Sequence, residues 1–297
     1  MTISILLKHE KTKVNNLLIY IHSLNHLNKK PIRKNMKKPL LLLTITLTIS
    51  RLGAICSMNS LTVFPVGMSI KQNTIFVIDG YAASQKIIKG LNDKFPIYLL
   101  GKNHKVKLNI KETLVGQFKL TQALLVPENE LIVGMEYTLI IDNLPENELF
   151  VRWNSELNKS GPIVYKVTEG KDSIKPIFKT IPKEIKKTYY NISCGPTIFV
   201  TFDCNVIDSS EYLIKTTVKC IETRKKTTYY IASNKGEMEI GHEMCSGAFH
   251  FEDGDNYEVE FSLMDASGNL TIWSGYRIQF TKPIDKNAKE EEKEEEY

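Results

Sequence analysis

The sequence lacks the motifs that common catalytic sites require. It contains no G-x-S-x-G turn around a nucleophilic serine, no glycine-rich phosphate loop and no EF-hand loop for calcium. Its loop carboxylates, such as Glu128, Glu130, Glu146 and Glu148, form no recognisable glycosidase pair. These absences predict no catalytic residue and no bound cofactor, and they favour a protein that is not an enzyme.

Long apolar runs are also scarce. Leu40–Ile49 is an apolar run of about ten residues, which is too short to span a bilayer, since a spanning helix needs about 20. It follows Lys37 and Lys38 and precedes small residues at Gly53 and Ala54. This order is typical of a secretory signal peptide, which we place at residues 36–56, with cleavage after Ala54 or Cys56. A lipid on Cys56 or an uncleaved anchor are the alternatives.

Residues 1–35 precede this segment and are rich in lysine, asparagine and histidine. We interpret them as a wrongly assigned start, with Met36 as the true first residue, or as a disordered extension. Residues 1–56 carry ten basic side chains against one acid, a net charge of +9. Because the whole chain has +5, the rest carries −4. Basic charge is therefore missing where a nucleic-acid surface would need it, and we expect no nucleic-acid partner.

What the chain does contain is a series of short, β-branched strands separated by turns. In Lys105–Lys111, for example, Val106, Leu108 and Ile110 alternate with polar residues, as in a half-buried strand. The pattern predicts an all-β protein with two tandem β-sandwich domains. We place the domains at 57–168 and 188–281, a linker at 169–187 and a charged, disordered tail at 282–297.

Two stretches carry a family resemblance. Pro127, Leu131, Gly134 and Tyr137 lie in LLVPENELIVGMEYTLII, and Asp265–Asn269 (DASGN) joins two strands near the end of the second predicted domain. Both resemble bacterial immunoglobulin-like domains of the envelope and surface-layer type. The resemblance implies that Tyr137 packs at a sandwich corner after a glycine-permitted loop. Gly268 and Asn269 tolerate the left-handed backbone that a tight turn requires.

Cysteines are few, and none lies between Cys56 and Cys194. Cys194, Cys204, Cys220 and Cys245 remain after cleavage, and an even number in an exported domain favours disulfides. In a seven-stranded sandwich we place Cys194 and Cys204 at the ends of the second strand, Cys220 at the end of the third and Cys245 before the fifth. This arrangement predicts Cys204–Cys245 and Cys194–Cys220, although four cysteines allow three pairings.

Two further features are candidates for binding. His242, Cys245 and His250 have residue types that hold zinc or copper, but a fourth ligand is not evident, so no metal is predicted. Trp273 falls on the polar face of its predicted strand, where it could contact a ligand. A local bulge would return it to the core.

The sequence as a whole favours an exported, non-catalytic binding or interaction protein of the envelope or the medium. Its expected partner is a protein or a glycan of the cell envelope, and membrane attachment is expected only through the leader or a lipid on Cys56. The alternatives are an enzyme acting on polysaccharide, or its accessory module, and a periplasmic metal-binding protein. Immunoglobulin-like modules present loops and sheet faces, and their functions reside in sites grafted onto them.

Overall fold

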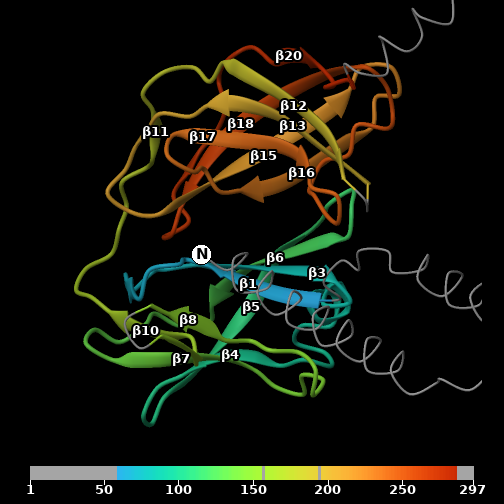
Figure 1. Cartoon of the computed structure of the whole chain (residues 1–297). Helices are drawn as coiled ribbons and strands as arrows, with labels where there is room; N and C mark the ends of the chain where they lie inside the picture. The colour runs from blue at the N-terminus through green and yellow to red at the C-terminus, as the bar shows by residue number, and fades with distance from the viewer. Residues whose placement is uncertain (1–58, 156–157, 193–194, 286–297) are drawn as a thin grey trace, which may run out of the picture. The chain divides into compact units, whose positions relative to one another are not determined.

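The computed structural model describes residues 59–155, 158–192 and 195–285, and nearly all of the regular structure in these ranges is β-strand (Figure 1). This confirms the all-β prediction. The described part of the chain contains one helix, α3 (Gln85–Lys89), which buries Ile87 and Ile88. No helix in these ranges is long and apolar enough to cross a membrane.

The N-terminal half, residues 59–168, is built around eight strands in the hydrogen-bonded order β1-β3-β6-β5-β4-β7-β10-β2 (Figure 1). The first strand pairs antiparallel with β3, whereas β2 pairs parallel with β10 at the other end of the path. A separate hairpin consists of β8 and β9. The bounds are β1 (Asn59–Phe64), β2 (Ser69–Ile70), β3 (Phe76–Ala82), β4 (Ile97–Leu100), β5 (Lys105–Val115), β6 (Leu120–Pro127), β7 (Glu136–Ile141), β8 (Arg152–Asn154), β9 (Lys159–Gly161) and β10 (Val164–Val167).

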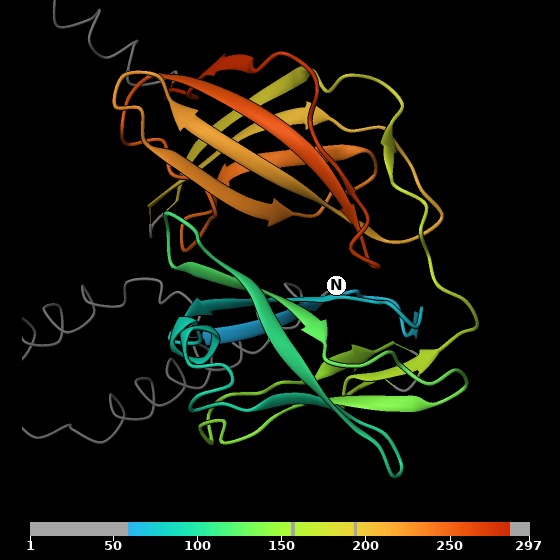
Figure 2. The ribbon, with the colours of Figure 1, turned by 180° about the vertical axis from the view of Figure 1, so that it is seen from behind.

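The long strand β5 lies in the middle of this order and connects β1, β3 and β6 on one side to β4, β7, β10 and β2 on the other (Figure 2). Its beginning pairs with β4 and its remainder pairs with β6, and the register shifts between Ile110 and Glu112. Val106 and Leu108 are fully buried, as their alternation predicts, but Ile110 is 40% exposed. The prediction for Ile110 was wrong: burial on this face ends at Leu108, and Ile110 is the last residue before the register shift.

The core of the N-terminal half contains two fully buried tyrosines, Tyr137 and Tyr165. The Tyr137 hydroxyl accepts a hydrogen bond from the Ile132 backbone N–H at 3.3 Å and lies 2.8 Å from His104 Nδ1. Gly134, between them, has φ +76°. Tyr137 thus packs in the core directly after a glycine-permitted turn, with its hydroxyl bonded to the backbone five residues upstream.

The C-terminal half, residues 184–285, has two sheets of its own, with the orders β12-β13-β17 and β16-β15-β18-β19, where β18 also pairs with β20. Side chains from both sheets, including Phe202 and Phe261, form its core together with Phe249 from the segment between β17 and β18. The bounds are β12 (Glu184–Ile192), β13 (Gly195–Asp203), β15 (Tyr212–Cys220), β16 (Lys226–Ile231), β17 (Glu237–His242), β18 (Asn256–Asp265), β19 (Leu270–Thr271) and β20 (Ile278–Thr281).

The segment between the halves is not free of structure. β11 (Ile177–Phe178) pairs antiparallel with β14 (Val206–Ile207), and Phe178 packs against the core of the C-terminal half. The predicted turn at Asp265–Asn269 is also present: Gly268 has φ +80°, and its N–H donates to the Asp265 carbonyl at 3.1 Å. The predicted signal peptide and most of the predicted charged tail lie outside the described residues.

Candidate functional site

The two halves are joined by specific hydrogen bonds. Gln122, on β6, is buried, and its side-chain amide exchanges two hydrogen bonds of 3.0 Å with the backbone N–H and C=O of Tyr230. Because Tyr230 lies on the edge strand β16, the amide takes the place of a neighbouring strand. Backbone bonds between Phe118 and Gly247 form a second connection.

A third connection lies at the start of the chain's second strand. The carboxylate of Glu211 accepts hydrogen bonds from the backbone N–H groups of Val66 and Gly67, at 2.8 and 2.6 Å. Apolar side chains from both halves pack together beside these bonds, among them Val77, Leu124 and Met264. The bonds and the shared apolar cluster fix the two sets of strands against each other.

Asp79 lies at this junction. It faces Gln122 in the register of β3 and β6. Its Oδ1 atom accepts hydrogen bonds from Gln122 Nε2 at 2.9 Å and from the Tyr229 hydroxyl at 2.5 Å. Burial raises the pKa of Asp79 to about 6, although the two hydrogen bonds act to lower it. No donor in the described part of the chain is bonded to Oδ2, so one carboxylate oxygen remains available.

A cavity of about 380 Å³, which we call the junction pocket, opens beside Asp79. Ser60, Thr62 and Tyr81 line it from the N-terminal half, and the hydroxyl groups of these residues have no hydrogen-bond partner among the described residues. The remaining lining residues are Leu120, Tyr229, Tyr230, Ile231, Ala232, Ser246 and Ala248. Among the described residues, no lysine, arginine or histidine lines the pocket, and Asp79 is the only one of them that brings a full charge to it.

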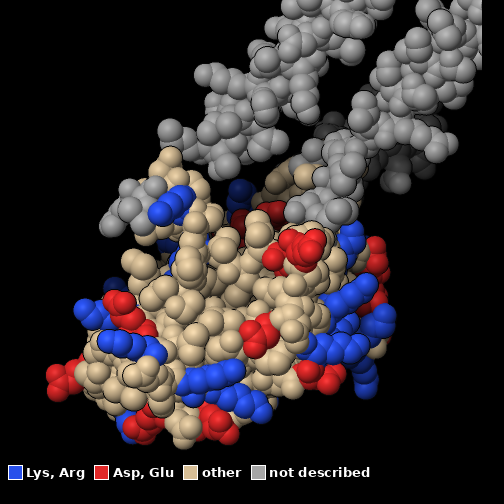
Figure 3. Space-filling model, turned by 90° about the horizontal axis from the view of Figure 1, so that it is seen from below, with Lys and Arg blue, Asp and Glu red and all other residues tan. Residues whose placement is uncertain are grey.

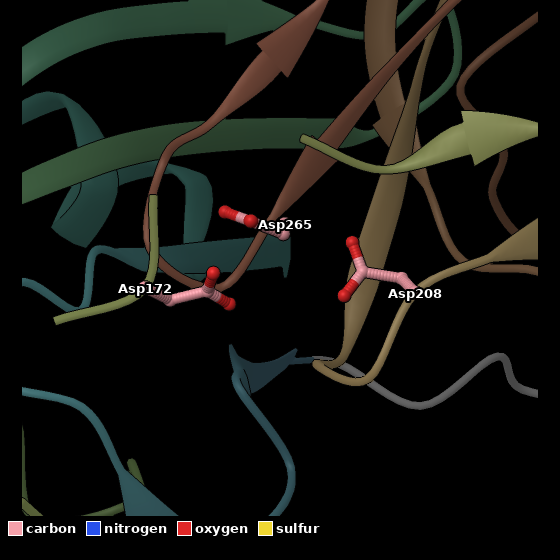
Figure 4. Close-up of side chains that lie close together, drawn as sticks. All are labelled: Asp172, Asp208 and Asp265. Atoms are coloured by element: carbon pink, nitrogen blue, oxygen red, sulfur yellow. The ribbon is translucent and has the colours of Figure 1, made fainter. Parts of the chain in front are cut away.

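Three aspartates form a second polar group, the aspartate cluster (Figure 4). Asp172, Asp208 and Asp265 each offer one carboxylate oxygen, and these oxygens lie within 4.8 Å of one another. Asp265 is fully buried, and burial raises the pKa of its carboxyl despite hydrogen bonds from Ser267 and Asn269.

Most acceptors in the aspartate cluster are already used by the chain. The Asp265 carboxylate accepts hydrogen bonds from the backbone N–H groups of Ser267 and Asn269, both at 2.8 Å. The Asp172 carboxylate accepts one from the Ser210 hydroxyl at 2.5 Å. Asp208 Oδ2 is shielded without a partner. The cluster therefore ties the β18–β19 turn to the segments before β11 and β15, which is a structural role that its hydrogen bonds account for.

The predicted metal candidates do not converge. The rings of His242 and His250 lie 4.3 Å apart, but His242 Nδ1 is 2.9 Å from the Glu243 carbonyl and His250 Nδ1 pairs with Glu252. In the described ranges, the aspartate cluster is the only group of three such residues with ligand atoms within 4.8 Å. His242, Cys245 and His250 do not form one.

The predicted disulfide pairing is wrong. Cys204 and Cys220 are both free and buried. Cys204 follows β13, whose end pairs with the start of β17 at Glu237, whereas Cys245 comes after the far end of β17. The pairing assumed a strand directly after Cys245, whereas β17 ends before Cys245 and the next strand, β18, begins only at Asn256. Cys194 lies outside the described residues.

Trp273 is half-buried, and its ring meets Phe178 and Phe261 edge to face, at centroid distances of 5.8 and 6.0 Å. It packs against the core of the C-terminal half. The sequence did not single out Asp79 or Gln122 as site residues. The available signal was a polar side chain among mostly apolar neighbours: Asp79 in Phe76–Ala82, and Gln122, next to Thr121, in Leu120–Pro127.

Charges of both signs are interspersed on the face shown in Figure 3, around a largely uncharged centre. Mixed charge of this kind does not focus a field of one sign. This face therefore presents no surface of a single charge sign.

Comparison with known proteins gives only distant likenesses. No protein-family model and no curated protein matches the chain. Among solved structures, tandem Ig repeats of Dlar share 8% identity, covering 76% of this chain and 96% of that one, with a TM-score of 0.22. The Yersinia pseudotuberculosis adhesin InvE shares 8%, covering 75% and 58%, with a TM-score of 0.20.

An Anoxybacillus sp. LM18-11 pullulanase, complexed with maltotriose, shares 9% identity over 69% of this chain, with a TM-score of 0.21. The matched part spans 24% of the pullulanase chain. These likenesses are compatible with immunoglobulin-like β modules, but at such TM-scores they support no argument about function.

Proposed function

We propose that this chain is an exported, non-catalytic binding protein of a bacterial cell envelope, built from immunoglobulin-like modules, and that the junction pocket is its binding site. The observation that carries the proposal is the open Asp79 carboxylate oxygen in a cavity lined by unpartnered hydroxyl groups. The signal-like segment at 36–56 supports export, and the tyrosine corner at Tyr137 supports the immunoglobulin-like class.

Binding fits the pocket better than catalysis does. A nucleophilic hydroxyl needs a base within about 2.6–3.2 Å. No hydrogen bond in the described part of the chain joins Ser60, Thr62 or Ser246 to a carboxylate or an imidazole. The one pocket carboxylate, Asp79, is held by Gln122 and Tyr229, and no second acid lines the cavity to work with it.

Two measurements on the full chain test this proposal. The first is the intact mass and the cell fraction of the protein made in a bacterial host with a periplasm. We expect a chain beginning near residues 55–57 in the exported fraction. A cytoplasmic chain that keeps residues 36–56 would contradict export.

The second measurement is co-sedimentation of the purified protein with isolated cell envelopes. Thr62→Trp fills the mouth of the pocket, and Thr113→Trp places the same ring on an exposed strand position outside it. We expect the wild type and Thr113→Trp to sediment with envelopes and Thr62→Trp to remain in solution. Equal sedimentation of all three would place binding elsewhere, and no sedimentation of the wild type would contradict an envelope ligand.

A further inference from the structure

From the chemistry of the junction pocket we infer a ligand class: we propose that it binds a small neutral saccharide, with Asp79 accepting hydrogen bonds from sugar hydroxyls. This inference rests on the proposed function. The pocket, at about 380 Å³, lies near the lower end of the range of about 300–1,000 Å³ for small-molecule sites. It therefore suits a ligand of one or two rings, not an extended polymer held along its length.

The charge of the pocket excludes several other ligands. Because Asp79 is the only charged group that lines it, phosphates, carboxylates and nucleotides would meet a negative group with no cation to balance them. A purely apolar ligand would displace the water that hydrogen-bonds to the open oxygen of Asp79 and would offer no donor in its place. Burial of that oxygen without a partner costs free energy. The pocket therefore requires a ligand that is rich in hydrogen-bond donors and carries no negative charge.

The hydroxyl groups of the pocket match a polyol. Ser60, Thr62, Tyr81 and Ser246 can each donate and accept a hydrogen bond, as each sugar hydroxyl can. The Tyr229 hydroxyl donates its hydrogen bond to Asp79, so the oxygen of this hydroxyl can only accept a hydrogen bond from a ligand in the cavity. A carboxylate held in position by the protein is a strong, directional acceptor for a ligand hydroxyl.

The apolar part of the lining suits the faces of a sugar ring. Tyr81, Leu120 and Ile231 place aromatic and aliphatic surface in the same cavity as the hydroxyls. An organic ammonium ion would also pair with Asp79, but it would leave most of the hydroxyl groups without partners, and burial without partners costs free energy. The combined lining favours the neutral saccharide over the cation.

The experiment is a calorimetric titration of the full chain with maltose, cellobiose and N,N′-diacetylchitobiose, with choline and glucose 6-phosphate as competitors of other classes. We expect saturable binding of at least one neutral disaccharide. We expect Thr62→Trp and Asp79→Asn each to weaken it about tenfold or more, the latter because a charged acceptor is lost. Thr113→Trp is the control and keeps the wild-type affinity. Circular dichroism checks that each variant is folded. If Asp79→Asn does not fold, Thr62→Trp alone provides the test.

The inference is overturned if none of the three disaccharides binds, if Thr62→Trp leaves the affinity unchanged, or if choline or glucose 6-phosphate binds more tightly. Its failure can be distinguished from failure of the proposed function. If the protein sediments with envelopes in a Thr62-dependent way but takes no disaccharide, the pocket is a binding site for another class of ligand. If it is not exported and does not sediment, the proposed function itself fails.

Discussion

Gln122 and Tyr230 are 108 residues apart in the sequence, and two hydrogen bonds of 3.0 Å join them. Gln122 satisfies both backbone groups of a residue on an edge strand of the other half, and it also donates to Asp79. One amide therefore holds the halves together and positions the carboxylate of the junction pocket. A shift between the halves would break the two bonds to Tyr230 and alter the pocket.

Replacing Gln122 with alanine is expected to destabilise the protein. It leaves the buried N–H and C=O of Tyr230 without partners, at a cost of about 1–3 kcal/mol for each group. We expect the free energy of unfolding, measured by urea denaturation, to fall by at least about 2 kcal/mol. Gln279→Ala, at an exposed position on β20, is the control and should change it little. A small effect of Gln122→Ala would mean that water replaces the amide.

Gly241, on β17, should tolerate no side chain. Its φ is +149°, and a Cβ atom there would lie 1.9 Å from the Ile198 carbonyl oxygen on the paired strand β13. We expect Gly241→Ala to cost about 3 kcal/mol or more, because backbone must move to relieve the contact. Gly161→Ala is the matched control, since a Cβ there meets nothing within 4 Å. Similar melting temperatures for the two variants would show that β17 can shift without penalty.

The sequence predicts best those features that depend on neighbours along the chain. The burial of Val106 and Leu108, the packing of Tyr137 and the turn at Gly268 follow from alternation and turn chemistry. Ile110 departs from its pattern although its register with β6 is unbroken from Leu108, because its burial depends on what packs over that end of the strand and not on alternation alone.

The junction pocket was not predictable for a related reason. Asp79 and Tyr229 are 150 residues apart, and only the docking of the two halves brings them together. The cysteine pairing failed because it depended on the order of strands: it assumed a strand directly after Cys245, but the next strand, β18, begins only at Asn256. Local patterns define strands well, but they do not define which strands meet.

The free state of Cys204 and Cys220 can be tested directly by chemical modification. Both are free and buried, and burial raises the pKa of the Cys204 thiol to about 12. Since the thiolate is the reactive form, iodoacetamide should leave both cysteines unmodified in the folded protein. In urea without reductant, peptide mass mapping should find both alkylated. If either is alkylated only after reduction, it takes part in a disulfide after all.

The aspartate cluster should behave as a structural hub. Asp265→Ala removes the acceptor for the N–H groups of Ser267 and Asn269 at a fully buried position, and we expect a loss of about 2–4 kcal/mol in unfolding free energy. Asp93→Ala, at an exposed position, is the control. Thermal melts in EDTA and in millimolar Ca²⁺ should coincide. A rise in melting temperature with Ca²⁺ that Asp208→Asn abolishes would instead assign a cation to the cluster.

Asp79 should make stability fall as pH rises. Its pKa is raised from 3.8 to about 6 in the folded protein, so between these values the folded state binds more protons than the unfolded state. Unfolding free energy therefore decreases with pH across this window, and the penalty is complete above pH about 6. The phenols Tyr81 and Tyr229 also line the pocket, but burial raises both of their pKa values, so they stay neutral.

Asp79→Asn removes the ionisation and should remove this pH dependence. We expect the stability of the variant relative to wild type to improve by about 1–2 kcal/mol between pH 4.5 and 7.5, a figure below the full shift because the side chain keeps some contact with solvent. Urea denaturation at a series of pH values measures it, with Asp93→Asn as the exposed control. The pH dependence of Asp265 and His242 is present in every variant and cancels in the difference. A stability difference that stays constant with pH would mean that Asp79 ionises as easily in the folded protein as in the unfolded chain. The carboxylate would then be well hydrated. It would have little preference for a sugar hydroxyl over water.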